Sequence, residues 1–133
     1  MAIPDTGTAP RTLAAGLDRF DCYRVAVAFH SVAAGLLGRG SGALRDQLDR
    51  ASASAVLNLA EGLGRRAPRD KAHFYAVARG SALESSAIIA LAAAREIGEP
   101  ARCEQAQQAL ARLVRMLDAL ERKMKACAAG VSR

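Results

Sequence analysis

The sequence has no tryptophan and only five aromatic residues among 133, so large rings cannot dominate its core. About half of the residues are nevertheless hydrophobic, and 31 positions are alanine. A core of alanine and leucine lets helices approach closely, but each alanine buries little apolar area. Because such a chain gains stability by burying surface against copies of itself, we expect a homo-oligomer.

Cysteine is also scarce, and the three present, Cys22, Cys103 and Cys127, show no CxxC spacing. An odd, widely spaced set argues against a disulfide framework and against a zinc site. No apolar run reaches the roughly 20 residues that span a bilayer. The N-terminus lacks the apolar core of a signal peptide. We therefore expect a reduced, cytoplasmic protein with no membrane contact.

The usual patterns of catalysis are missing as well. The serines at 81–86 have no histidine placed to activate them, and no phosphate-binding loop is present. Neither His30 nor His73 follows a glutamate by three residues, which is the spacing that di-iron bundles use. A metal-dependent enzyme built on Glu61, Glu84 and His73 is therefore the least favoured hypothesis. The sequence predicts no catalytic residue, no metal and no cofactor.

Charge of one sign is in excess, since the formal net charge is +6. A basic surface favours anionic partners, above all nucleic acid, although the same charges can serve solubility alone. Aromatic residues do not alternate with the cations, which argues against sequence-specific reading of single strands. The candidate nucleic-acid-binding residues are Arg65, Arg66, Arg69, Lys71, Arg112, Arg115, Arg122 and Lys123.

Apolar residues recur at helical spacing in four segments, at about 21–37, 44–61, 68–97 and 100–127. Glycines separate the segments, Ser41 is placed to cap the second, and prolines stand where the third and fourth begin. No stretch shows the alternation of a strand. The sequence therefore predicts four helices joined by short loops.

The last segment is the most regular, because its apolar residues alternate in steps of three and four over more than three heptads. Such a seam is typical of coiled-coil-like packing. The fold class predicted is all-α, an antiparallel up-down-up-down four-helix bundle at 18–127, with flexible tails at 1–17 and 128–133. The seam residues are Cys103, Ala106, Leu110, Leu113, Leu117, Leu120, Met124 and Cys127.

The second and third helices can be aligned by folding the chain back at the turn near 66–67. This alignment sets Ser54 opposite Gly80, where small residues would let the two backbones approach closely. It also sets Arg50 opposite Glu84, so we expect a partly shielded ion pair between the helices.

The polar stretch "NLAEGLGRR" lies at the end of the second helix. Asn58 and Glu61 are three residues apart and share one helix face. We expect their side chains to bond to backbone groups that become free where Gly62 breaks the helix. The residues predicted to form this structural motif are Arg50, Asn58, Glu61, Gly62, Gly80 and Glu84.

The segment 47–85 resembles the four-helix bundle protein family, also known from the intervening sequences of bacterial large-subunit ribosomal RNA genes. Two substitutions depart from the family pattern: Val56 replaces a proline, and Ala67 replaces a serine cap, which forfeits roughly 1 kcal/mol of capping. The matching residues are Gln47, Leu48, Arg50, Ala51, Ser54, Asn58, Ala60, Glu61, Gly62, Gly64, Arg65, Arg66, Gly80, Ser81 and Glu84.

The resemblance implies a homopentameric barrel of bundles with a basic surface. Its relatives include the accessory variability determinant of diversity-generating retroelements, which implies nucleic acid and a reverse transcriptase as partners. The leading hypothesis is thus a non-enzymatic oligomeric adaptor that binds RNA or DNA. The resemblance suggests that such an adaptor serves as a reverse-transcriptase accessory protein. The alternative is a structural protein–protein interaction module with no nucleic-acid role.

Overall fold

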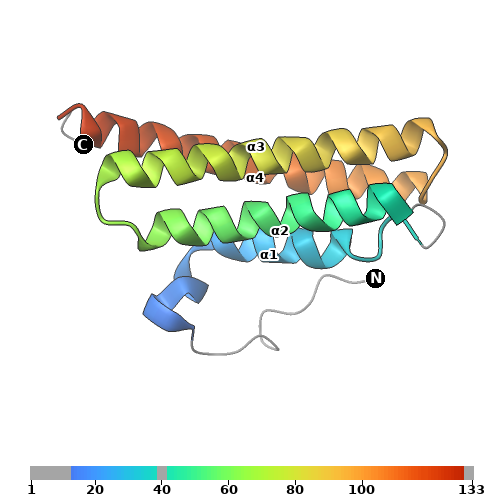
Figure 1. Cartoon of the computed structure of the whole chain (residues 1–133), viewed down its shortest axis with the longest axis horizontal. Helices are drawn as coiled ribbons and strands as arrows, with labels where there is room; N and C mark the ends of the chain where they lie inside the picture. The colour runs from blue at the N-terminus through green and yellow to red at the C-terminus, as the bar shows by residue number, and fades with distance from the viewer. Residues whose placement is uncertain (1–12, 39–41, 131–133) are drawn as a thin grey trace.

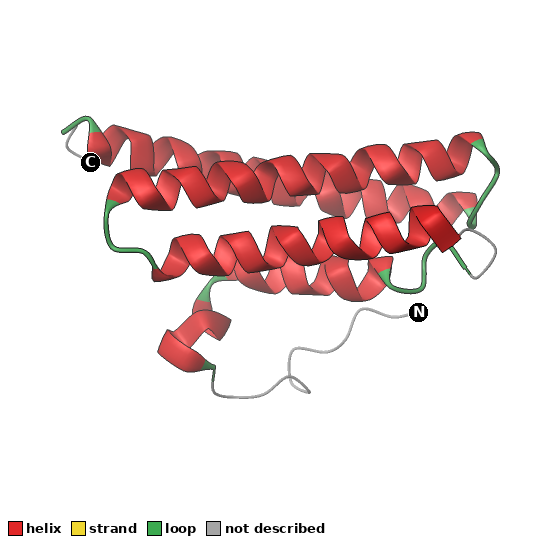
Figure 2. Cartoon of the chain, in the orientation of Figure 1, coloured by secondary structure: helices red, strands yellow, loops and turns green. Residues whose placement is uncertain are grey.

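Four helices make up most of the part of the chain that the structure describes, residues 13–38 and 42–130 of a computed structural model. A short 3-10 helix, η2, comes first, and no described residue lies in a strand (Figure 2). Consecutive helices are joined at alternating ends of an elongated molecule, as the predicted bundle requires (Figure 1). The elements are η2 Ala14–Arg19, α1 Asp21–Ala33, α2 Gly42–Gly64, α3 Pro68–Ala94 and α4 Pro100–Ala128.

The helix borders differ from the sequence-based prediction mainly at α1, which ends at Ala33 instead of continuing to about 37. The expected cap Ser41, residues 1–12 of the expected N-terminal tail and residues 131–133 of the expected C-terminal tail lie outside the described residues. Residues 14–17 of the expected N-terminal tail belong to η2. At α3, Ala67 provides no side-chain cap, as expected from its missing hydroxyl, and Pro68 stands in the first turn. Proline suits this position because the N–H that it lacks has no partner inside the helix.

The core confirms most of the predicted seam of α4. Its first five members, from Cys103 to Leu117, are buried, together with leucines and alanines of the other helices. Beyond Leu117 the pattern changes, because Leu120 and Met124 are only half-buried while Glu121 is buried. The last turns of α4 thus place a carboxylate where the apolar spacing predicted a leucine.

Small side chains bring α2 and α3 together. The hydroxyl oxygens of Ser54 and Ser81 lie 2.8 Å apart, which confirms the close approach expected near this level. Two residues earlier in α2, Ser52 Oγ lies 2.7 Å from His30 Nδ1 and so connects α2 with α1. These contacts fix the register of the three helices.

Two parts of the predicted α2–α3 contact are wrong. Arg50 and Glu84 are both exposed, and no ion pair joins them among the described residues. The contact between Ser54 and Ser81 places Arg50 and Glu84 at similar heights along the two helices. Both residues are nevertheless on the outer surface and not in the contact between the helices. Gly80 is also exposed, and an added Cβ there would meet nothing within 4 Å, so no close approach requires glycine at this position.

Candidate nucleic-acid interface

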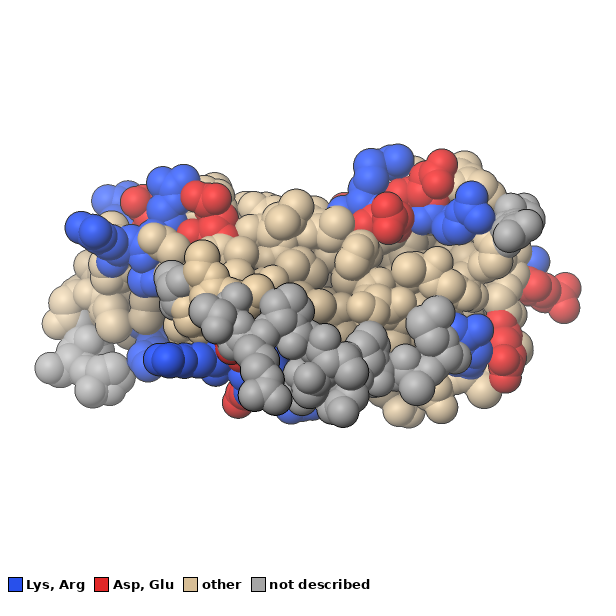
Figure 3. All heavy atoms as spheres, turned by 90° about the horizontal axis from the view of Figure 1, so that it is seen from below, with Lys and Arg blue, Asp and Glu red and all other residues tan. Residues whose placement is uncertain are grey.

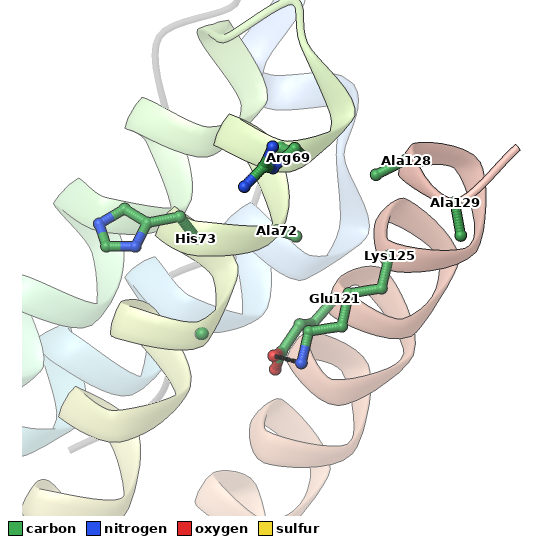
Figure 4. A pocket seen from close by; sticks show the side chains of 8 residues that line it. Arg69, Ala72, His73, Glu121, Lys125, Ala128 and Ala129 are labelled. Carbon is green, nitrogen blue, oxygen red and sulfur yellow. Dashed lines mark ion pairs between the residues drawn. The ribbon is translucent and has the colours of Figure 1, made fainter.

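The α2–α3 turn and the C-terminal end of α4 lie at the same end of the bundle (Figure 1). Cations that are more than 50 positions apart in the sequence therefore share one surface. Between α3 and α4 this end is hollowed by a cleft of about 570 Å³. Figure 4 shows Arg69 on the α3 side and Lys125 on the α4 side of the cleft, and His73 on α3 also lines it.

Lys71 is not a free cation of this surface. Its Nζ donates hydrogen bonds to two backbone carbonyls at the end of α2, Gly62 O at 3.2 Å and Leu63 O at 3.0 Å. The last carbonyls of a helix have no partner within the helix, so a lysine from the neighbouring helix satisfies them. Lys71 thus fastens the start of α3 to the end of α2.

The prediction that Asn58 and Glu61 bond to the loop backbone is therefore wrong. Asn58 Nδ2 donates back along its own helix, to Ser54 O at 2.9 Å and Ser54 Oγ at 3.0 Å. Glu61 accepts a hydrogen bond from Arg65 Nε at 2.9 Å. Asn58 finds its partners one turn earlier in α2, and Glu61 pairs with Arg65 just beyond the end of α2. The carbonyls at the end of α2 are reached instead from the first turn of α3.

Gly62 is needed for packing, not for breaking the helix, because α2 continues to Gly64. A Cβ on Gly62 would lie 2.7 Å from Tyr75 Cε1 and 3.2 Å from Phe74 Cβ. The buried ring of Tyr75 occupies the space that a side chain would need. The glycine therefore lets the first turns of α3 pack directly on the backbone of α2.

Several of the remaining cations at this end already have anionic or aromatic partners. Arg65 pairs with Glu61 at 2.8 Å and lies 4.8 Å above the centre of the Phe74 ring. On α4, Arg122 pairs with Asp118 at 3.0 Å. Among the predicted nucleic-acid-binding residues at this end, Arg66, Arg69 and Lys123 form no ion pair or side-chain hydrogen bond with any described residue.

A group of charges that the sequence analysis missed joins α3 to α4 beside the cleft. Arg79 Nε lies 3.5 Å from Glu121 Oε1, and Arg79 Nη1 lies 3.8 Å from Asp118 Oδ1. Lys125 Nζ lies 2.8 Å from the other oxygen of the Glu121 carboxylate. The spacing of 118, 121, 122 and 125 along one helix is a signal that could have indicated these pairs.

Arg112 does not join this end of the molecule, and Arg115 follows it on α4 by three residues. Arg112 lines a second hollow, between α1 and α4, which also contains Arg24 and Arg102. At 1.5 Å of rise per residue, Arg112 lies roughly 20 Å along the helix from Lys125. The eight predicted nucleic-acid-binding residues are thus divided between two regions of the surface.

The geometry offers little for catalysis. Among the described residues, no group of three or more histidine, cysteine or acidic side chains is placed to hold a metal ion. His73 instead packs edge-on against Phe74, with ring centres 5.0 Å apart. Burial raises the pKa of the Cys22 thiol to about 11 and also raises the pKa of Cys103, so both thiols are uncharged at neutral pH. A neutral thiol is a poor nucleophile.

Comparison with protein families finds a match to the model of the 23S rRNA-intervening sequence protein over residues 22–119. The match covers α1 except its first residue, all of α2 and α3, and most of α4. The chain belongs to this family. A comparison with curated proteins finds no similar sequence. The resemblance seen in residues 47–85 is therefore confirmed, and the match extends it to residues 22–119.

Proposed function

We propose that this intervening-sequence protein is a non-enzymatic helical adaptor that binds RNA or DNA at one end of its bundle. The observation that carries the proposal is the basic end, which we define as Arg66, Arg69 and Lys123. Arg66 comes from the α2–α3 turn, Arg69 from the first turn of α3 and Lys123 from α4, and none forms an ion pair within the described part of the chain. In the view of Figure 3 the end of the molecule at the left carries more blue than red.

The chemistry of the basic end suits a phosphate backbone. An arginine guanidinium donates two parallel hydrogen bonds to a phosphate, and each neutralised phosphate releases counterions. Phe74 is half-buried beneath Arg65, so its ring is not free to stack on a base. The expected binding is therefore insensitive to sequence and strongly dependent on salt.

The test compares two charge reversals that change the net charge equally. Arg66→Glu with Arg69→Glu alters the basic end, whereas Arg45→Glu with Arg95→Glu alters the opposite end of the bundle. Binding to a labelled single-stranded RNA and to a DNA duplex is measured by fluorescence anisotropy between about 50 and 200 mM salt.

We expect the wild-type protein to bind in a salt-dependent manner, the first double variant to lose about tenfold in affinity, and the second to lose much less. Equal losses would show that net charge alone attracts the nucleic acid. No binding by the wild-type protein would contradict the proposal and favour the alternative, a protein–protein module. A reverse transcriptase is the protein partner that the family resemblance suggests for the adaptor.

We also propose that the protein is a homo-oligomer, and an apolar surface on α3 supports this. Large hydrophobic residues are exposed there, with Val77 at 38%, Leu83 at 50% and Leu91 at 52%. Between Val77 and Ala94 the exposed positions of α3 include one charged residue, Glu84. We name these exposed positions the outer face of α3.

The occupant that we propose for this face is a second copy of the chain. By length and composition, α3 is the one helix among those described that is apolar enough to cross a bilayer, and only 33% of the apolar window is buried. However, α3 packs against both α2 and α4, so it serves as a helix of the bundle. Burial against another copy removes the exposed apolar area from water without unfolding the bundle. The resemblance suggests five copies in a ring.

A further inference from the structure

A second hollow, of about 470 Å³, lies between α1 and α4, away from the basic end. Its floor is apolar, and we name it the α1–α4 groove. Phe29 and Ala106 at its base are almost completely buried, whereas the residues along its sides are partly exposed. The apolar lining consists of Val25, Ala28, Phe29, Val32, Ala106 and Ala109.

The groove exists because α1 covers α4 incompletely. α1 has 13 residues and α4 has 29, and these two helices are in less extensive contact than α2 with α3 or α3 with α4. Where they face each other, Ala28 and Ala109 supply single methyl groups instead of longer side chains. Two backbones separated by short side chains leave a trough that the chain itself does not fill.

Arginines stand at both ends of the trough. Arg102 lies at the end near Val32, while Arg24 and Arg112 lie at the end near Asp21. Arg24 pairs with Asp21, the one carboxylate in the lining. Arg102 and Arg112 form no ion pair with any described residue. They are ten positions apart on α4, which corresponds to roughly 15 Å along the helix.

We propose that the α1–α4 groove binds an acidic amphipathic helix of a partner protein. The apolar floor matches the apolar stripe of such a helix, and the two unpaired arginines match carboxylates about three turns apart on it. A phosphodiester backbone lacks the apolar surface that would cover Phe29 and Val25. A small anion does not reach both arginines. The charge pattern and the floor together therefore favour a helix.

This site goes beyond the proposed nucleic-acid binding and is separate from it. The two unpaired arginines of the groove, Arg102 and Arg112, lie on the first half of α4, whereas Lys123 of the basic end lies near the C-terminal end of that helix. The groove also uses α1 and α4, whereas the outer face belongs to α3. One copy of the bundle can thus hold a protein helix and a nucleic acid at the same time.

The probe is a synthetic helical peptide with leucines at the spacing of one helix face and glutamates near both ends. The control peptide has the same composition in a scrambled order that abolishes the apolar stripe. Affinity is measured by fluorescence anisotropy near physiological salt. We expect the patterned peptide to bind at least about tenfold more tightly than the scrambled one, because only the patterned peptide covers the apolar floor.

Variants of α4 locate the binding. Arg102→Glu with Arg112→Glu should weaken binding of the patterned peptide about tenfold or more. Arg115→Glu, exposed on the same helix but outside the groove, should weaken it much less. Circular dichroism verifies that the variants fold. Equal binding of the two peptides, equal effects of the variants, or no saturable binding would overturn the proposal.

The same peptide separates this inference from the proposed nucleic-acid binding. The variant Arg66→Glu with Arg69→Glu should bind the patterned peptide as the wild-type protein does. Peptide binding without any nucleic-acid binding would contradict the adaptor function and support the groove. Nucleic-acid binding without peptide binding would overturn the groove and leave the adaptor function supported.

Discussion

At the scale of single residues, two glycines in helix interiors have opposite surroundings. Gly62 of α2 lies against the ring of Tyr75, where a Cβ on residue 62 would come within 2.7 and 2.9 Å of the two nearest ring atoms. Gly80 of α3 has open space around the same position. The resemblance to the family includes both glycines, but only Gly62 has a packing reason within one copy of the chain.

Gly62→Ala should lower the free energy of unfolding by about 1–3 kcal/mol, because the methyl group overpacks the contact with Tyr75. This loss outweighs the gain of about 1 kcal/mol from the higher helix propensity of alanine. Gly80→Ala should instead raise the free energy of unfolding by about 0.5–1 kcal/mol. Urea unfolding of both variants checks this, and an unchanged midpoint for Gly62→Ala would contradict the packing role.

Because of Cys22, the free energy of unfolding is expected to decrease at alkaline pH. Burial raises the pKa of its thiol from 9.0 to about 11 in the folded protein, while the unfolded chain ionises at the ordinary value. The unfolded state therefore loses its proton first. Below pH 9 both states are protonated and the contribution is complete, and it is lost as the pH rises from 9 toward 11. The pKa of Cys103 and of Tyr75 is raised as well, and these groups act in the same direction.

Cys22→Ala should reduce the fall of the melting temperature over this pH range. The variant also loses packing, but that loss lowers the melting temperature equally at every pH, so the slope isolates the thiol. The melting temperatures of the wild-type protein and the variant, measured between pH 8 and pH 11, give the two slopes to compare. Parallel curves across the whole range would show that Cys22 does not titrate differently on folding.

At the scale of elements, the join between α2 and α3 depends on a lysine that sequence patterns did not single out for this role. Lys71 reaches back across the turn to the carbonyls of Gly62 and Leu63. The turn itself is only three residues, 65–67, so the first turns of α3 lie next to the end of α2. Carbonyl groups at the end of α2 thereby accept hydrogen bonds from a side chain of α3, the next helix in the chain.

Lys71→Met keeps most of the length of the unbranched side chain and removes its donors. It should lower the free energy of unfolding by about 1–2 kcal/mol, because two helix-end carbonyls lose a charged donor. Arg69→Met is the matched control, since Arg69 is exposed and forms no ion pair among the described residues. Its effect should stay within about 0.5 kcal/mol. Equal effects of the two variants in urea unfolding would contradict the role of Lys71.

The second element-scale feature is the charged contact between α3 and α4. Glu121 is buried, with only 6% of its side chain exposed, and one carboxylate oxygen accepts no hydrogen bond. Arg79 and Lys125 hold this charge through ion pairs at 3.5 and 2.8 Å. The compensation of a buried carboxylate by two cations explains why the apolar seam can be interrupted here.

At the scale of the whole molecule, the outer face of α3 is expected to decide the oligomeric state. Leu83→Glu with Leu91→Glu should convert the proposed oligomer into a 13.9 kDa monomer, because it places two charges in the buried contact. Ala111→Glu with Ala119→Glu, at exposed positions of α4, should leave the assembly intact. Light scattering after size exclusion measures the mass.

Thermal unfolding provides a second measurement of the same assembly. If folded copies bind one another, the melting temperature of the wild-type protein rises with protein concentration, and that of the Leu83→Glu, Leu91→Glu variant does not. A wild-type protein that is monomeric and unfolds independently of concentration would exclude the assembly on this face.

The sequence was sufficient for the helices because the signals that define them are local. Apolar spacing, the proline at 68 and the proline at 100 depend only on nearby residues, and they placed α3 and α4 almost as found. The family was also recognisable from residues 47–85. The end of α1 was missed, because Leu36 and Leu37 are buried without being helical and so continue the apolar spacing past Ala33.

By itself, then, the sequence determined how many helices form, approximately where they begin and end, and that they pack as a bundle. Only the tertiary structure decided which polar groups meet. Arg50 and Glu84 are level but point outward, whereas Lys71 reaches the helix end that Asn58 was expected to bind. Counting residues gives the level of each side chain along an axis. Its partner depends on how each helix is rotated about that axis, and packing of the whole bundle sets this rotation.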